Sequence, residues 1–416
     1  MVNGDDFDYD LIIIGAGAAG LSLLLALDDV EYTQSVKLIE RSSGPQNDRI
    51  WSFWNNNSVP TYLKAIVTQE WQKWEISADD CNYPMSHPYH RYCSIRSESL
   101  INLALERVQA KAHFDIEFDS DVISVSSASE NALVTTQGGQ LTARWVVDTR
   151  PPPLKTNHNG LLQCFYGEEV VTDGDVFNPS TVKLMQQLTS SELGIEFVYI
   201  LPFSANHALV EFTCFSPCIV ERSILQARFK SRMHEIIGSQ KYKVERKECA
   251  VLPMYCINEN INNKNKHLIY AGISGGAMRA SSGYSFLACQ IWAKQCATEL
   301  KSKPLLSELP TTSTSSTPKL SSFSPIGSVY QKMDRLMLAV LRNDMDVGVT
   351  IFVQMFKKVK PVRFVRFMTE QATISDFICV VWAMPKGAFV LALFRAFFRS
   401  SFRALLSRKK LSVTDE

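Results

Sequence analysis

The pattern of apolar positions predicts a β-α-β unit at the beginning of the chain. Tyr9–Ile14 is a continuous run of mostly β-branched apolar residues, typical of a strand buried in a parallel sheet. The glycine-rich segment Gly15–Gly20 follows at once, and Leu21–Leu27 then has the pattern of a helix. Val36–Glu40 is a second short apolar run, which we expect to be the next strand.

Further along the chain, the pattern separates a strand-rich middle from a helical end. Strands are expected at 115–118, 122–125, 144–147, 161–166, 197–201, 208–215 and 267–271. Helices are expected at 224–237, 286–300, 329–341, 347–358, 374–384 and 388–406. Residues 301–325 are dense in Ser, Thr and Pro, which predicts a linker.

This order of elements predicts an α/β fold: a Rossmann-like dinucleotide-binding domain, an inserted mostly-β substrate or cap domain, and a helical C-terminal region. The expected division is a discontinuous cofactor-binding domain of 1–70, 93–155 and 265–300, a cap domain of 71–92 and 156–264, the linker, and a basic C-terminal region of 326–416.

Gly15, Gly17 and Gly20 form a GxGxxG motif with a strand before it and a helix after it. Such glycines let the backbone approach a pyrophosphate, and the helix N-terminus supplies N–H groups. Glu40, at the end of the next strand, is placed to accept hydrogen bonds from a ribose. The alternative is a β-α-β turn that binds nothing.

A second glycine cluster, containing Gly272, Gly275 and Gly276, follows the late strand. GxGxxG alone fits either NAD or FAD. A first β-α-β unit combined with a distant glycine loop before a helix favours FAD, since the late loop would hold the far end of the flavin.

The charge of the chain is balanced overall but uneven along its length. The 43 Lys and Arg against 42 Asp and Glu exclude a strongly basic nucleic-acid binder. From Tyr330 onward, however, 15 basic residues face 7 acidic ones. In the expected helix 388–406, Arg395, Arg399 and Arg403 form one stripe beside Phe and Leu, which suits either an anionic lipid surface or packing on the protein body.

The sequence predicts no metal site, no signal peptide and no membrane-spanning helix. The ten cysteines contain no CxxC pair, and His87 and His90 lack an evident third ligand, so no metal is expected. The acidic N-terminus lacks the apolar core of a signal peptide. The longest apolar stretch, Phe377–Phe394, is interrupted by Pro385 and Lys386, so a spanning helix is not expected.

Several segments distributed in order over nearly the whole chain carry a family resemblance. They are Arg49–Trp54, Val146–Arg150, Phe165–Glu169, Phe177–Pro179, Leu184–Met185, Phe197–Ser204, Ala208–Thr213, Ser281–Ser285, Arg366–Met368 and Ala383–Pro385. Together they resemble the flavin-dependent lycopene β-cyclases of bacteria, which implies the glutathione-reductase-like flavoprotein fold. Three features depart from the family pattern: Ala250 replaces a usual glycine, Ala280 a usual proline, and a single carboxylate, Glu211, a usual acidic pair.

The resemblance implies a redox-neutral isomerase that closes the ψ ends of lycopene, or a related acyclic carotenoid, into β-ionone rings, giving γ-carotene and β-carotene. It implies reduced FAD, kept reduced by NAD(P)H, as a negative charge that stabilises a cation. It also implies a peripheral enzyme at the cytoplasmic face of the membrane, in contact with lipid and with other carotenoid enzymes.

Glu211 is the expected acid–base residue, because it interrupts an apolar strand and burial would keep a proton on it. The alternative places Glu211 on the polar face of an edge strand. Arg49 is expected either to anchor the flavin phosphates or to pair with a surface acid.

Two other kinds of function remain open from the sequence. One is an FAD-dependent monooxygenase or isoprenoid reductase of the same fold, and the other is a flavoprotein that binds a carotenoid at the membrane without catalysis. The number of ends cyclised, the nicotinamide used and the oligomeric state are not determined by the sequence.

Overall fold

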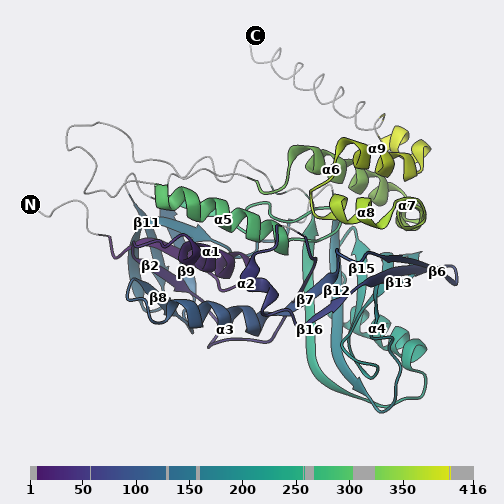
Figure 1. The fold of residues 1–416 in the computed structure, drawn as a ribbon, viewed down its shortest axis with the longest axis horizontal. Coiled ribbons are helices and arrows are strands. Elements are labelled where there is room, and N and C mark those ends of the chain that lie inside the picture. Colours follow the sequence, from purple (N-terminus) through teal and green to yellow (C-terminus); the bar gives the residue numbers. More distant parts are fainter. Residues whose placement is uncertain are drawn as a thin grey trace, which may run out of the picture. The chain divides into compact units, whose positions relative to one another are not determined.

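The computed structural model describes residues 7–56, 58–127, 131–155, 160–255, 257, 267–302, 324–392 and 394 (Figure 1). The predicted linker therefore lies almost entirely outside the described residues, as does the predicted helix 388–406 beyond residue 394. The chain forms two compact units, Met1–Trp71, Tyr89–Lys155 and Cys256–Gly327 in the first, and Gln72–Pro88, Thr156–Tyr255 and Ser328–Glu416 in the second.

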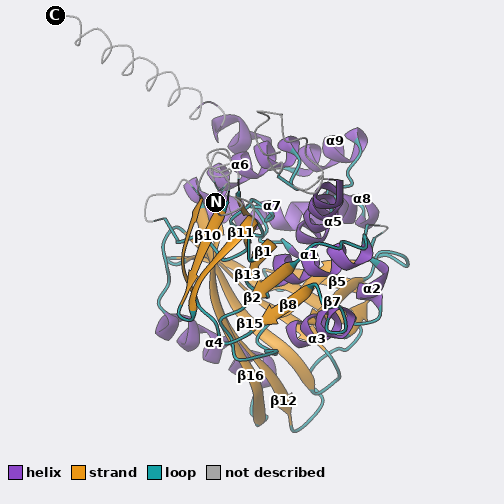
Figure 2. Cartoon of the chain, turned by 90° about the vertical axis from the view of Figure 1, so that its left-hand side faces the viewer, coloured by secondary structure: helices purple, strands orange, loops and turns teal. Residues whose placement is uncertain are grey.

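The first unit is built on a seven-stranded sheet in the order β8-β2-β1-β11-β10-β9, with β17 also paired to β11 (Figure 2). The strands β8, β2, β1, β11 and β17 are parallel where they pair, whereas β9 and β10 are antiparallel. Their bounds are β1 Tyr9–Ile14, β2 Val36–Ile39, β8 Phe114–Glu117, β9 Val122–Ser127, β10 Ala132–Thr136, β11 Gly139–Asp148 and β17 Leu268–Tyr270.

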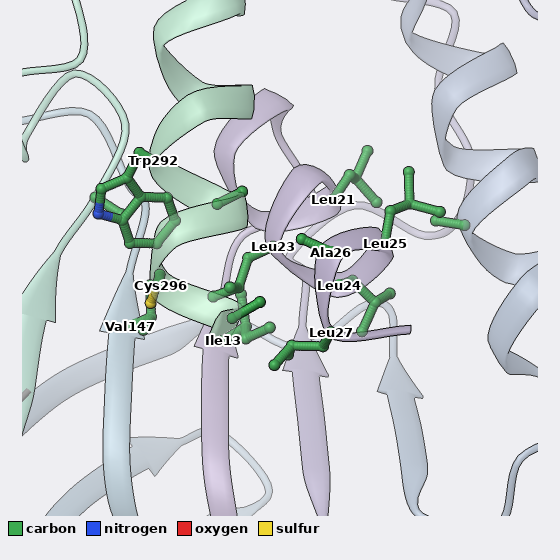
Figure 3. Packing of buried hydrophobic residues seen from close by; sticks show 14 of the residues in the cluster. Ile13, Leu21, Leu23, Leu24, Leu25, Ala26, Leu27, Val147, Trp292 and Cys296 are labelled. Carbon is green, nitrogen blue, oxygen red and sulfur yellow. The ribbon is translucent and has the colours of Figure 1, made fainter. Parts of the chain in front are cut away.

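Alternating side chains of β1 enter two different cores. Leu11 and Ile13 belong to a large cluster that includes residues of α1 (Ala18–Asp29), α3 (Ser97–Val108) and α5 (Phe286–Ser302). Figure 3 shows Ile13 close to Leu23 of α1, on the side where Cys296 and Trp292 of α5 lie. Ile12 and Ile14 join a smaller cluster with residues of β9 and β10. Because both faces of β1 are covered, its run is apolar at every buried position.

A three-stranded sheet, in the order β3-β7-β4, completes the first unit together with the short helix α2 (Thr61–Lys64). Its strands are β3 Ile50–Trp54, β4 Gln69–Trp71 and β7 Tyr92–Arg96. Trp54 packs on Tyr92 and on Tyr284, with ring centroids 4.7 Å and 5.1 Å apart. Trp54 and Trp71 are therefore buried core residues of this unit.

The second unit contains a seven-stranded sheet in the order β16-β12-β15-β14-β13-β5-β6. All neighbours are antiparallel except β13 and β5. The strands are β5 Lys73–Ala78, β6 Cys81–Ser86, β12 Leu161–Thr172, β13 Thr181–Ser191, β14 Gly194–Pro202, β15 His207–Ser216 and β16 Tyr242–Met254.

Helices pack on both faces of this second sheet. Tyr166 of β12 contacts Phe229 of α4 (Arg222–Ile237), with ring centroids 5.3 Å apart. Phe215 of β15 contacts Phe352 of α7 (Met345–Lys358) at 6.2 Å. Tyr166 lies opposite Phe212 in the ladder, so Phe215, three residues further on, points to the other face. The sheet therefore has an α4 face and an α7 face.

Other helices that follow the sheet in the described part of this unit include α6 (Ser328–Asn343), α8 (Pro361–Met368) and α9 (Ile374–Ala383). In the described part of the chain, no single helix is long and apolar enough to cross a membrane. The pair Ile374–Ala383 and Lys386–Ala392, bent by 100° at its break, meets that requirement together by length and composition.

The predicted α/β class is confirmed, with its parallel sheet, its mostly-β part and its C-terminal helices. The apolar runs predicted as strands, and the helices predicted before residue 384, are present, although β11, β12 and β14 are several residues longer than predicted. The sequence pattern did not predict β3, β4, β5, β6, β7, β10, β13, β16, α2, α3 or α8.

The Arg366–Met368 motif has a structural role at the start of α9. Arg366 makes two hydrogen bonds to the buried Asp376 carboxylate, at 2.8 Å and 2.7 Å. Asp376 and Thr373 also form a capping box at this helix end. The hydrogen bonds from Arg366 are the main cause that lowers the pKa of Asp376 to about 2.

We predict that Asp376→Asn destabilises the protein by about 1–2 kcal/mol at neutral pH. Because the folded pKa lies below the ordinary value of 3.8, the contribution of Asp376 is present above pH 4 and disappears as the pH falls toward 2. Urea unfolding at several pH values measures this. Asp80→Asn, at an exposed turn with φ of 59°, is the control. Equal stability of the Asp376 variant and the native chain at pH 7 would contradict the prediction.

Candidate functional site

The glycine loop between β1 and α1 has the close approaches that its sequence predicts. A Cβ on Gly20 would lie 2.0 Å from the carbonyl oxygen of Gly15, so helix and loop could not pack this closely with any other residue. Gly15 has a φ of +99°, and a Cβ there would meet Thr149 Oγ1 at 2.7 Å. Gly17 is the N-cap of α1, and no side chain caps that end of the helix.

Glu40 and Arg49 both lie at this loop. Glu40 accepts hydrogen bonds from the Ala16 N–H at 2.6 Å and from the Ser42 N–H at 2.9 Å. Arg49 pairs with the neighbouring Asp48 at 3.0 Å, and its Nη1 lies 3.9 Å from the position of a Cβ on Gly17. The guanidinium therefore pairs with a surface acid and also lies beside the loop, so the two alternatives for Arg49 do not exclude each other.

The late glycine loop packs directly on the start of α1. A Cβ on Gly272 would lie 3.2 Å from the Cβ of Ala19, and Gly272 has a φ of +62°. The N–H of Gly275 donates to the carbonyls of Ala271 and Gly272, while Gly276 has a φ of +80°. The structure therefore brings the two predicted glycine clusters together, although they are far apart in the sequence.

The Val146–Arg150 motif braces this arrangement. Arg150 makes a bidentate contact with Asp148, with Nε and Nη2 at 3.0 Å and 2.7 Å from the two carboxylate oxygens. Ser274 of the late loop donates to the carbonyl of Arg150, and the Ala271 N–H donates to the carbonyl of Asp148. Asp148 and Arg150 thus hold the late loop against the end of β11.

These residues fit a dinucleotide. The helix end without a side-chain cap and the close-packed glycines leave backbone N–H groups for a pyrophosphate. Arg49 supplies a positive charge beside Gly17, and Glu40 supplies a carboxylate at the end of β2. The roles of the individual residues toward a bound cofactor remain predictions.

Glu211 lies in the middle of β15, on the α7 face of the second sheet. It shares this face with Phe215, because the two residues are four positions apart in a strand. Its neighbours across the ladder are Gly167 of β12 and Tyr199 of β14. Since β15 has a paired strand on each side, the alternative that Glu211 lies on an edge strand is wrong.

A second carboxylate, Glu248 of β16, meets Glu211 across β12. Gly167 lies opposite Glu211 on one side and opposite Glu248 on the other, so the three form one row on one face. The Glu211 and Glu248 carboxyls are hydrogen-bonded to each other. A Cβ on Gly167 would lie 2.5 Å from Glu211 Cγ, so the absence of a side chain on Gly167 gives the pair its room.

The environment of Glu211 favours its protonated form. The residue keeps partial exposure, yet burial of the carboxyl group is the largest influence on it. Burial, and then the charge and hydrogen bond of Glu248, raise the pKa of Glu211 well above its ordinary value, while the charge of Arg246 acts in the opposite direction. Such a carboxyl is suited to give a proton near neutral pH.

A network of charges continues from this pair along the same face. Arg246 donates to Glu248 at 2.9 Å and to Glu169 at 3.2 Å. His207 Nε2 lies 2.9 Å from the second oxygen of Glu169. The side chains of Arg246, Glu169 and Glu248 are each at most 11% exposed, so these ion pairs are largely screened from water.

The two alanines that depart from the family pattern cause no backbone strain. Ala250 lies in β16 opposite Phe165, and neither it nor Ala280 has a positive φ. Ala250 therefore occupies an ordinary strand position, which alanine adopts as readily as glycine.

The sequence analysis missed Glu248 and Gly167 as site residues. Glu248 lies in a strand with many charged residues, and nothing local to it indicates that it faces Glu211. A glycine inside the apolar segment Phe165–Glu169 was the available signal, since glycine in a strand often marks a close approach. Within the described ranges, no group of three or more His, Cys, Asp or Glu side chains is arranged to hold a metal.

We predict that Gly20→Ala destabilises the first unit by about 3 kcal/mol and lowers retention of a bound dinucleotide. The added Cβ would overlap the Gly15 carbonyl, which is backbone and cannot move aside without shifting the loop. Thermal unfolding and the absorbance of retained cofactor measure both effects. Gly387→Ala, where a Cβ meets nothing within 4 Å, is the matched control. Native cofactor retention in the Gly20 variant would contradict the prediction.

Solved structures share the fold of most of this chain at low sequence identity. A geranylgeranyl bacteriochlorophyll reductase-like protein from Thermoplasma acidophilum has a TM-score of 0.60 and 11% identity, over 91% of this chain and 97% of its own. The p-nitrophenol 4-monooxygenase of Pseudomonas putida has a TM-score of 0.57 and 12% identity, over 92% and 98%. A halogenase in complex with FAD has a TM-score of 0.51 and 8% identity, over 86% and 78%. These likenesses confirm the predicted fold class.

Sequence relatives are lycopene β-cyclases. That of Paracoccus sp. is 25% identical over 209 residues, which are 50% of this chain and 52% of the relative. That of Pseudescherichia vulneris is 25% identical over 254 residues, 59% of this chain and 61% of the relative. The matches thus span between half and two thirds of these relatives. The family model described as lycopene cyclase protein matches residues 10–394, so the chain belongs to the lycopene cyclase family.

Proposed function

We propose that the protein is a lycopene β-cyclase, an isomerase that closes the ψ ends of lycopene or a related acyclic carotenoid into β-ionone rings. The observation that carries the proposal is a carboxyl with a raised pKa, Glu211, on a sheet face that also carries aromatic side chains, in a member of the lycopene cyclase family. The lycopene β-cyclases that match the chain support the substrate class.

The reaction needs one proton in and one proton out, with no net transfer of electrons. A proton adds to the terminal double bond, the neighbouring double bond captures the resulting cation, and a ring proton is then lost. Glu211 is the proposed donor, because its environment keeps it protonated to higher pH than an ordinary glutamate.

The same sheet face offers aromatic rings for the cation. Tyr199 lies opposite Glu211 in the ladder, and Phe165 and Phe197 lie opposite Thr213, two residues along β15. Residues two apart in a strand share a face, so these three aromatic residues lie on the same side of the sheet as Glu211, in its row or in the next row on that face. The faces of aromatic rings attract cations, which suits a carbocation intermediate.

FAD is the proposed cofactor, held by the glycine loop, Arg49, Glu40 and the late loop with Gly272, Gly275 and Gly276. When bound in its reduced form, FAD supplies negative charge that stabilises a cation, and NAD(P)H is the proposed reductant. The FAD-bound halogenase that shares the fold supports this choice of nucleotide.

We predict that the native protein with reduced FAD cyclises lycopene without oxygen, and that Glu211→Gln lowers the rate at least about 100-fold while FAD is retained. The amide keeps the shape of the side chain but cannot give up a proton in the same way. Chromatography of anaerobic reactions measures the product, and the flavin spectrum measures FAD.

The same assay separates the other functions that share this fold. A requirement for oxygen would indicate a monooxygenase, and stoichiometric consumption of NAD(P)H with a saturated product would indicate a reductase. Bound but unchanged carotenoid would indicate a binding protein. Full cyclase activity of the Glu211→Gln variant would contradict the assignment of the acid.

The enzyme is also proposed to act at the cytoplasmic face of a membrane, where its hydrocarbon substrate is dissolved. Support comes from α9, which exposes an apolar stripe: Ile374, Ile378, Val381 and Trp382 are 81%, 53%, 55% and 67% exposed. These positions recur at the spacing of one helix face. The Lys386 ammonium lies 3.6 Å from the centroid of the Trp382 ring, which places a positive charge at the stripe and suits anionic lipid.

We predict that Ile378→Glu combined with Trp382→Glu lowers binding to anionic phospholipid vesicles at least about tenfold. Each change removes an apolar contact with the lipid and adds a negative charge that the anionic headgroups repel. Vesicle sedimentation measures binding, and the flavin spectrum reports folding of the first unit. Ile219→Glu, at an isolated apolar residue that is 58% exposed, is the control. Equal binding of the α9 variant and the control would contradict the proposed docking surface.

A further inference from the structure

The two carboxyls over Gly167 are not equivalent. Glu248 accepts a hydrogen bond from Arg246 at 2.9 Å, which stabilises its ionised form. Glu211 has a hydrogen bond to Glu248 and feels the charge of Arg246. Two carboxyls that meet at hydrogen-bonding distance in a site of low exposure cannot both ionise easily, so one proton is held between them.

We propose that Glu211 and Glu248 form a carboxyl pair that shares one proton, with Gly167 giving the pair its room and Arg246 holding Glu248 as the ionised member. The inference rests on the proposed cyclase function for its role in catalysis. Glu248 and Arg246 are positioning residues, which act on the substrate through Glu211.

Such a pair can act as acid and then as base in one cycle. It begins with one proton, on Glu211. Transfer of this proton to the terminal double bond leaves two carboxylates and a carbocation. After ring closure, a ring C–H bond breaks, its electrons form the ring double bond, and its proton returns to the pair. The repulsion between two adjacent carboxylates makes them a stronger base for that last step than a lone carboxylate.

Arg246 is equipped to stabilise the doubly ionised state. Its Nη1 binds Glu248 and its Nε binds Glu169, while its buried Nη2 has no hydrogen-bond partner among the described residues. A buried N–H without a partner is costly, and a carboxylate that forms nearby can satisfy it. Among the described residues, other ionisable groups on this face include Glu169, His207, Tyr199 and Lys243. Glu169 is already paired with Arg246 and His207, and Lys243 is paired with Glu245.

Infrared spectroscopy tests the pair without any carotenoid. The native protein should show the C=O band of a protonated carboxylic acid at neutral pH, and the band should be lost in Glu211→Gln. In Glu248→Gln the band should disappear at a pH about one unit lower than in the native protein, since the charge that opposes ionisation of Glu211 is gone. Absence of the band in the native protein, or an unchanged titration in the Glu248 variant, would overturn the proposal.

Enzyme activity provides a second test of the carboxyl pair. Glu248→Gln should shift the basic limb of the pH profile of kcat/KM to lower pH and lower kcat about tenfold or more. Gly167→Ala should separate the carboxyls, because its Cβ would lie 2.5 Å from Glu211 Cγ, and should remove the pH shift that the pair produces. Glu245→Gln, on the same strand but paired with the exposed Lys243, is the matched control and should leave the profile unchanged.

The infrared and activity measurements together distinguish this inference from the proposed function. A chain that shows the shared proton by infrared spectroscopy but forms no ring would contradict the cyclase function and support the pair. Ring formation by a chain without a protonated Glu211 would contradict the pair and support the cyclase function. Retained FAD in each variant shows that the first unit is folded. The infrared measurement on the native protein tests the pair even if a variant fails to fold.

Discussion

The register of three antiparallel strands is the constraint on which the candidate acid–base site depends. Gly167 of β12 must lie opposite Glu211 of β15 and Glu248 of β16 at once. Because side chains alternate between faces, a shift of one residue in either ladder would send one carboxylate to the α4 face. The β12–β15 ladder is uninterrupted, and the bulge in the β12–β16 ladder lies between Glu169 and Val170, beyond the row that holds the pair. The site is therefore a property of the sheet as a whole.

The sequence predicts those parts of the fold in which the composition of a segment reflects the burial of that same segment. Tyr9–Ile14 is covered on both faces, so its composition alone indicates a buried strand. Gly20 was also predictable, because helix and loop approach each other too closely there for a side chain. β16 escaped prediction because its first half alternates exposed and partly buried residues, most of them charged, and it becomes a strand through pairing with the distant β12. Pairing of this kind leaves no periodic apolar signal in the strand itself.

The same distinction applies to the site. Glu211 could be found because a carboxylate inside an apolar strand is unusual in its own sequence context, and the family resemblance added to that signal. Glu248 could not be identified from the sequence, because only strand pairing places it opposite Gly167 and near Glu211. Its hydrogen bond with Arg246, two positions before it, is likewise visible only in the structure. Arg366 shows the converse: its motif carries part of the family resemblance, yet its contacts with Asp376 fix the beginning of α9.

The fold alone does not select the reaction, because a reductase-like protein and a monooxygenase share it at 11% and 12% identity. The charge balance on the α7 face does constrain the chemistry. Three carboxylates, Glu169, Glu211 and Glu248, share one guanidinium there, and Arg246 contacts Glu169 and Glu248 directly. Burying a further unpaired negative charge is costly, whereas a proton removes that cost. The proton belongs on Glu211, the carboxyl that receives no hydrogen bond from Arg246, and it is there that the aromatic side chains of β12 and β14 line the same face. An acidic proton among aromatic rings is the arrangement that a hydrocarbon cyclisation requires.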